Sequence, residues 1–142
     1  MAGTSSAYGD VSKVIADLQY LGIDHVRDHA LDPTLNQGGY GSLAAAGIRF
    51  DLIISPGTDL SYTASFAAAH PGALTALEGP NEINLWPITF NGLTGNDAGV
   101  SYMSYLAGAM QGYSAFNGVP LYTLTLAGQA LGTAAGVGNV HV

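Results

Sequence analysis

The sequence contains no cysteine and few charged residues of either sign. The absence of cysteine excludes disulfide bonds, thiolate catalysis and zinc sites built on cysteine. Only three of the 142 residues are Lys or Arg, against ten Asp and Glu, which gives a net charge of −7. Because no basic patch is available to neutralise phosphate groups, we expect neither nucleic acid nor an anionic membrane surface as a partner.

Two further absences concern the processing of the chain. The sequence has no Asn-x-Ser/Thr sequon, and its first ten residues lack the basic and apolar regions of a signal peptide. The residues themselves therefore leave the cellular compartment open. We expect one domain over residues 1–142, long enough for a sizeable core, with a flexible N-terminal segment at 1–9.

No charged residue occurs between Ala98 and Val142. Residues 99–116 are long enough to span a bilayer, and Gly108 and Gly112 form a GxxxG motif. The same stretch holds three Tyr, three Ser and one Gln, with few Leu or Ile. This composition predicts a buried, tightly packed helix over Ala98–Phe116 rather than a membrane span.

One pattern recurs five times along the chain: a helical stretch, a glycine that ends it, and a short β-type run. The glycines are Gly22, Gly47, Gly72, Gly118 and Gly136. The predicted helices are Val11–Leu21, Tyr40–Ala46, Leu60–Ala69, Ala98–Phe116 and Gln129–Ala135. The predicted strands are Ile23–Arg27, Ile48–Ile54, Leu74–Gly79, Leu121–Leu126 and Asn139–Val142. Asp10 and Asp59 are the expected N-caps of the first and third helices.

Strands that alternate with helices at these spacings predict an α/β fold with a parallel sheet. The two architectures that fit are an open doubly wound sheet and part of a (β/α)₈ TIM barrel. A complete barrel needs about 250 residues, so five strands would form a partial barrel cut from a larger domain. Strand order separates the two, because a barrel arc keeps sequential neighbours and a doubly wound sheet reverses.

The segment LEGPNEINLW, Leu77 to Trp86, contains both glutamates of the chain and its only tryptophan. In parallel α/β folds the loops after the carboxyl ends of the strands carry the chemistry. Asn81 and Glu82 follow a predicted strand directly, so we expect them at this position. The simpler alternative makes Glu82 a solvated loop carboxylate and Asn81 a turn residue after Pro80.

The EGPNEIN segment resembles the Asn-Glu motif at the end of strand four of clan A retaining glycoside hydrolases, which are TIM barrels. The resemblance implies that Glu82 is the general acid/base and that Asn81 binds the 2-hydroxyl of the sugar. Arg27 in HVRDH matches an arginine that the clan places at the end of strand two, near the nucleophile. His141 in NVHV matches a strand-six residue beside the substrate. The five predicted strands would then be strands two to six.

The chemistry suits these residue types, because a glycosidic oxygen leaves readily only when an acid protonates it. The implied partner is a carbohydrate, and no cofactor or metal is implied. Trp86 could offer an apolar face to a pyranose ring or simply pack against the protein. His29 could contact substrate or serve in a loop or cap. His25 and His29 would lie about 13 Å apart along a strand, too far to share a metal ion.

Retaining hydrolysis needs two carboxyl groups about 5–5.5 Å apart. Glu78 would lie about 13 Å from Glu82 on a regular strand, so we expect it to be a buried acid or a partner for Arg27. In the clan the nucleophile is a glutamate on strand seven, which this chain would not reach. The expectation is a glycosidase-like domain that lacks its nucleophile. The alternatives are a non-catalytic carbohydrate-binding or self-assembling module, and an open α/β domain that binds a small ligand.

An unclosed parallel sheet would expose the edges of its outer strands. The apolar segments DLIIS and LYTLTL are prone to pair with other strands. We therefore expect a homo-oligomer, or association with the missing part of the barrel. If the glycosidase resemblance holds, a secreted protein that acts on an extracellular polysaccharide is favoured.

Overall fold

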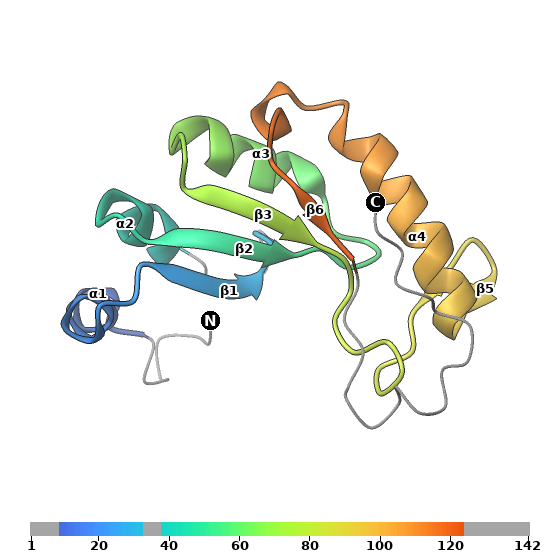
Figure 1. The fold of residues 1–142 in the computed structure, drawn as a ribbon, viewed down its shortest axis with the longest axis horizontal. Coiled ribbons are helices and arrows are strands. Elements are labelled where there is room, and N and C mark those ends of the chain that lie inside the picture. Colours follow the sequence, from blue (N-terminus) through green and yellow to red (C-terminus); the bar gives the residue numbers. More distant parts are fainter. Residues whose placement is uncertain (1–8, 33–37, 124–142) are drawn as a thin grey trace.

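The computed structural model describes residues 9–32 and 38–123, which form a parallel sheet, four α-helices, a separate hairpin and one 3₁₀ turn (Figure 1). The helices are α1 Val11–Leu21, α2 Gly39–Ala45, α3 Leu60–Ala69, α4 Gly95–Met110 and the 3₁₀ turn η1 Ser114–Phe116. The strands are β1 His25–His29, β2 Arg49–Ile53, β3 Leu74–Glu78, β4 Thr89–Phe90, β5 Leu93–Thr94 and β6 Leu121–Tyr122.

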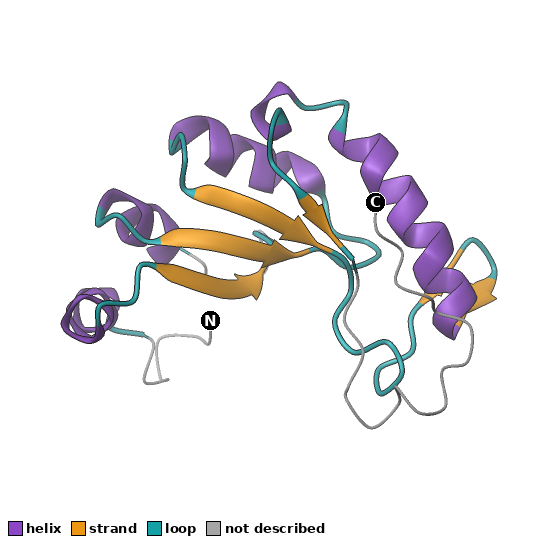
Figure 2. Ribbon diagram, in the orientation of Figure 1, coloured by secondary structure: helices purple, strands orange, loops and turns teal. Residues whose placement is uncertain are grey.

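The main sheet has four parallel strands in the order β1-β2-β3-β6 (Figure 2). Each strand lies beside the strand that precedes it in this sheet, so the order does not reverse within the described residues. The predicted α/β class with a parallel sheet is confirmed. The segment DLIIS does not form an edge, because β2 lies between β1 and β3, and the edges of the described sheet are β1 and β6.

One face of the sheet packs against the helices. The core there combines Phe50, Leu52 and Leu77 from the strands with side chains of α2, α3 and α4, such as Leu43 and Leu106. Helix α1 adds only a half-buried stripe to this core: Val11, Val14, Ile15 and Leu18. Among the described residues, no helix is long and apolar enough to cross a bilayer.

Side-chain alternation places a different set of residues on the opposite face of the sheet. Arg27, Asp51 and Glu78 each adjoin a strand residue that packs in the helical core, so they point away from the helices. We call these three residues the polar face. Arg27 is level with Asp51 on the neighbouring strand, and Glu78 is level with Ile53.

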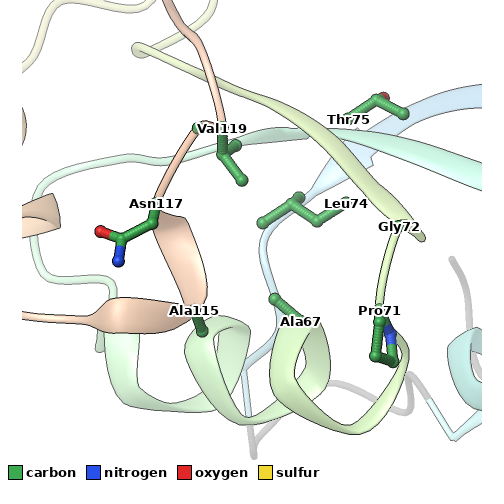
Figure 3. A pocket seen from close by; sticks show the side chains of 9 residues that line it. Ala67, Pro71, Gly72, Leu74, Thr75, Ala115, Asn117 and Val119 are labelled. Carbon is green, nitrogen blue, oxygen red and sulfur yellow. The ribbon is translucent and has the colours of Figure 1, made fainter.

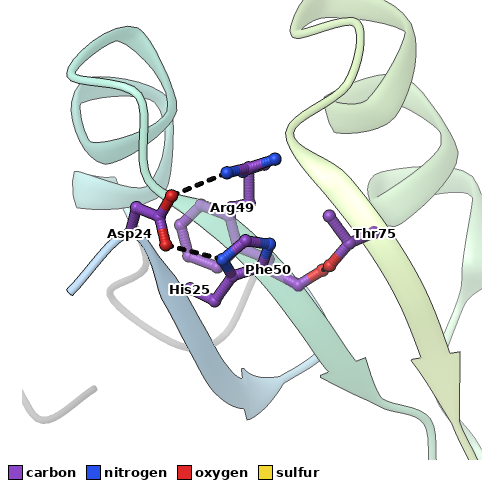
Figure 4. Close-up of polar contacts among 5 residues, drawn as sticks. All are labelled: Asp24, His25, Arg49, Phe50 and Thr75. Atoms are coloured by element: carbon purple, nitrogen blue, oxygen red, sulfur yellow. Dashed lines mark hydrogen bonds and ion pairs between the residues drawn. The ribbon is translucent and has the colours of Figure 1, made fainter.

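A β-bulge in β3 keeps the apolar residues of this strand on the face of the sheet that packs against the helices. Leu74 and Leu77 are three residues apart, yet both lie in the helical core. A regular strand would turn them to opposite faces, and one extra residue corrects the phase. The pairing shifts between Phe50 and Asp51, where Thr75 is the extra residue. Its hydroxyl donates a hydrogen bond of 2.8 Å to the Phe50 carbonyl oxygen (Figure 4).

The local signals for helix ends predicted the structure well. The bounds of α1 and α3 match the prediction, and the side chains of Asp10 and Asp59 accept hydrogen bonds from the backbone at their N-termini. Four of the five predicted glycines adopt positive φ angles, as a left-handed residue beyond a helix requires. The fifth glycine, Gly136, lies outside the described residues.

Three main differences separate the structure from the prediction: two predicted elements have other bounds, and one element was not predicted. Strand β1 begins two residues late, because the Ile23 amide still bonds to the Leu18 carbonyl beyond the end of α1. The strand also continues two residues further, to His29, so Arg27 is in the middle of its strand rather than at its end. The helix predicted over Ala98–Phe116 instead runs Gly95–Met110, with η1 following after a short break.

The third difference is the β4–β5 hairpin, which lies beside α4 and was not predicted (Figure 1). Its turn is formed by Asn91 and Gly92, both at positive φ, so the Asn-Gly pair was the available sequence signal. Several other predictions lie outside the described residues: the flexible segment at 1–8, the end of the 121–126 strand, and the last helix and strand.

Candidate functional site

The centre of the candidate site is an ion pair between Arg27 on β1 and Glu78 at the end of β3. The Arg27 Nε donates to Glu78 Oε2 and its Nη2 donates to Oε1, both at 2.6 Å. The two strands are separated by β2, a span of about 10 Å, which the extended arginine crosses. Glu78 is 4% exposed, whereas the Arg27 side chain is 42% exposed. The prediction that Glu78 partners Arg27 is therefore confirmed.

The same guanidinium also holds the loop that follows β3. Arg27 Nη2 donates a hydrogen bond of 2.9 Å to Asn81 Oδ1. Arg27 therefore connects Glu78 on β3 to the loop after that strand, and it fixes the orientation of the Asn81 carboxamide. Asn81 lies, as predicted, just beyond the carboxyl end of a parallel strand.

Glu82 begins a tight turn and has an unusual backbone conformation. Its φ angle is 49°, in the left-handed region that few residues other than glycine adopt. Its carbonyl oxygen accepts bonds from the amides of Leu85 (2.8 Å) and Trp86 (2.9 Å), which stabilise the turn. The Glu82 residue is half-buried. Such strained positions recur at ligand and active sites, where the surrounding structure enforces them.

Three carboxylates act on the single cation of the site. The pKa of Arg27 is raised chiefly by its hydrogen bonds to Glu78, and the negative charges of Glu78, Asp51 and Glu82 add to this. Partial burial of the guanidinium opposes the shift. The charge of Glu82 therefore acts on the guanidinium that binds Glu78 and Asn81.

Asp51 belongs to this site, although the sequence analysis did not propose it. Its Oδ1 is buried and has no hydrogen-bond partner among the described residues. Burial raises the pKa of the Asp51 carboxyl, the charge of Glu78 raises it further, and Arg27 lowers it. The available sequence signal was an aspartate between Phe50 and Leu52, two apolar residues in the middle of the strand.

We expect Asp51→Asn to stabilise the protein at neutral pH by about 1 kcal/mol, because it removes a partly buried negative charge that Glu78 repels and that solvent screens in part. The folded-state pKa is raised, so the native protein retains its proton after the unfolded chain has lost it. The contribution of Asp51 to stability therefore falls as the pH rises above about 3.9, the pKa of an unfolded aspartate. Urea unfolding at pH 3 and pH 7 measures this.

The difference between variant and wild type should vanish at pH 3, where Asp51 is protonated in both states. Asp17→Asn, on the exposed surface of α1, is the control and should change stability by less than about 0.5 kcal/mol at either pH. A stabilisation by Asp51→Asn that is equal at both pH values would show that charge is not its cause.

The remaining predicted site residues are more dispersed. His29 is exposed at the end of β1, on the same side of the strand as Arg27, and its carbonyl oxygen accepts a 3.1 Å hydrogen bond from the Tyr40 hydroxyl. Trp86 is 72% exposed, so the alternative that it packs in the protein is wrong. His141 lies outside the described residues. The described ranges contain no group of three or more His, Asp or Glu that could hold a metal ion.

Two other features lie at the opposite, amino-terminal end of the strands. Asp24 binds Arg49 Nη2 at 2.6 Å and lies 2.7 Å from Nδ1 of His25, all three being exposed (Figure 4). The pKa of Asp24 is lowered, first by His25 and then by Arg49. A shallow pocket of about 340 Å³ lies between α3 and η1 and has no charged side chain in its lining (Figure 3).

The polar cluster at the carboxyl ends of the strands is thus the described site with the most varied chemistry. It combines a part-buried ion pair, an oriented carboxamide, a strained glutamate and an exposed indole. Comparisons of the chain with protein-family models, with curated proteins and with solved structures gave no match.

Proposed function

We propose that the chain is a glycosidase-like domain whose carbohydrate site is formed by Arg27, Asn81 and Glu82. The observation that carries the proposal is the Arg27 bridge, which joins β1 to the Asn81–Glu82 loop at the carboxyl ends of parallel strands. Active sites of (β/α)₈ enzymes lie at this end of the sheet. The resemblance of EGPNEIN to the clan A motif supports the same assignment.

The proposed architecture is an arc of a TIM barrel. The sequential order of the four parallel strands, with helices on one face, is consistent with such an arc. The polar face of Arg27, Asp51 and Glu78 would then line the barrel interior, beneath the substrate site at the carboxyl ends of the strands.

In this proposal Glu82 donates a proton to the glycosidic oxygen as the bond breaks. The carboxamide of Asn81, oriented by Arg27, binds a hydroxyl beside the reacting carbon. Glu78 is engaged by two hydrogen bonds with Arg27, so it is not the nucleophile. A retaining reaction needs a second carboxylate, and the proposal assigns this group to a polypeptide segment other than the described residues.

The alternative is a carbohydrate-binding domain without turnover. It is favoured by the state of the other carboxylates of the site, because Glu78 is ion-paired and Asp51 lies within the sheet. Both functions require binding of a sugar at the Arg27–Asn81–Glu82 cluster, and they differ only in whether Glu82 transfers a proton.

Hydrolysis of aryl glycosides tests the role of Glu82. In the presence of the segment that supplies the second carboxylate, Glu82→Gln should lower kcat/KM about 10³-fold on phenyl glycosides, within the range for loss of a general acid. The loss should be much smaller with dinitrophenyl glycosides, because their leaving group departs without protonation. Asp17→Asn, on the outer surface of α1, is the matched control and should retain full activity.

Isothermal titration with the same sugars separates the two functions. Binding without turnover, weakened by Asn81→Ala, would favour the non-catalytic domain. Equal activity of Glu82→Gln and wild type on phenyl glycosides would contradict the acid role. A chain that neither binds nor hydrolyses any sugar in the set would contradict both functions.

A further inference from the structure

The most exposed apolar residues near the site are Leu85 and Trp86, at 57% and 72% exposure. They are consecutive residues of the turn that starts at Glu82. Trp86 is the only tryptophan of the chain. A large indole that is mostly exposed to water gains little from the hydrophobic effect in the folded protein, and this one lies four residues from Glu82 of the proposed site.

The backbone beneath the indole is well fixed. The amides of Leu85 and Trp86 both donate to the Glu82 carbonyl oxygen, and Ile83, within the same turn, is 1% exposed. The turn is therefore anchored on its inner side and presents Trp86 on its outer side. The backbone that carries the ring is therefore already ordered before a ligand binds, which lowers the entropy cost of binding.

The distance from Glu82 to Trp86 suits a ligand longer than one sugar. The Trp86 amide bonds four residues back, as in a single α-helical turn, and four residues of such a turn rise about 6 Å. One sugar unit of a polysaccharide has a comparable length. A sugar held at Asn81 and Glu82 would therefore place its neighbour in the chain near the indole.

We infer that Trp86 is a stacking platform for a second sugar unit, and that the site takes an oligosaccharide or polysaccharide rather than a single glycoside. This inference rests on the proposed function. The apolar C–H face of a pyranose matches the broad face of the indole, whereas the hydroxyl groups at the ring edge remain in water. Affinity should therefore rise with the length of the ligand.

The lone tryptophan makes the test direct, because all indole fluorescence of the chain comes from Trp86. The full chain is titrated with homologous oligosaccharides of one to six units from cellulose, xylan and mannan. For the series that binds, the emission should shift to the blue with two or more units but stay unchanged with the monosaccharide. By calorimetry, Trp86→Ala should weaken tetrasaccharide binding about tenfold and leave monosaccharide binding unchanged.

Trp86→Tyr should restore most of the lost affinity, since it keeps an aromatic face. Tyr20→Ala, which removes another exposed aromatic ring on α1, is the matched control and should bind like the wild type. Tetrasaccharide binding could depend on Asn81 while the Trp86 emission and the affinity of Trp86→Ala stay unchanged. That result would contradict the role of Trp86 as a stacking platform without contradicting the proposed function. Absence of binding to every oligosaccharide would overturn both.

Discussion

Arg27→Met is expected to lower the free energy of unfolding by about 2 kcal/mol. Removal of one partner from a buried ion pair costs about 3–5 kcal/mol, because the other charge stays buried without compensation. Glu78 is buried and loses two charge-assisted hydrogen bonds at once. The exposure of the Arg27 side chain admits some water to the vacated space, which places the expected value below that range. Urea unfolding at pH 7 measures it.

Arg49, the other arginine of the chain, provides the matched control. Its partner Asp24 is exposed, and such surface pairs contribute about 0–1 kcal/mol. Arg49→Met should therefore be close to wild type. The double variant Arg27→Met/Glu78→Met should recover most of the lost stability, because apolar residues often replace a buried pair without penalty. An Arg27→Met variant as stable as Arg49→Met would contradict the account of the ion pair.

Phe50→Ala is expected to have the largest effect on stability, about 3–5 kcal/mol. Phe50 is fully buried on β2, stacked on Tyr40 with ring centroids 4.9 Å apart and packed edge-on against Phe66 at 5.5 Å. The variant loses transfer free energy, leaves a cavity between α2 and α3, and breaks two aromatic pairs. Single domains have total stabilities of about 5–15 kcal/mol, so a melting temperature lower by about 10 °C or more is expected.

Differential scanning calorimetry gives the melting temperature directly. Phe50→Leu, which keeps most of the apolar volume, should lie between Phe50→Ala and the wild type. Tyr20→Ala removes a ring of similar size that is 90% exposed, and it should change the melting temperature little. If Phe50→Ala melted within a few degrees of this control, the aromatic cluster would not be the centre of the core.

The elements that sequence predicted best carry their signals within a few residues. Helix α1 has a capping aspartate, an apolar stripe and a glycine stop, and α3 has a capping aspartate before its start. Strand β1 was predicted two residues early, because capping bonds beyond Gly22 hold Ile23 at the end of the helix. The unpredicted hairpin has a local signal too, at Asn91 and Gly92, which the prediction did not use.

The location of the site and one of its contacts, the pair of Arg27 and Glu78, were predicted, whereas its other contacts were not. The position of Asn81 and Glu82 after a strand follows from the alternation of strands and helices. The pairing of Arg27 with Glu78 joins residues 51 positions apart, across an intervening strand, and depends on the register of three strands. The bulge at Thr75 sets that register. The unpaired oxygen of Asp51 depends on the same packing, which no local pattern in the sequence encodes.

The two faces of β2 should accept mutations very differently during evolution. Phe50 and Leu52 interlock with the helices, so a lineage can vary them only within narrow limits of size and shape. Asp51, Arg27 and Glu78 lie on the other face of the described sheet, away from the helical core, so paired changes among them would leave the scaffold intact. New ligand preferences could thus arise by substitution at positions 27, 51 and 78 without loss of the folded chain.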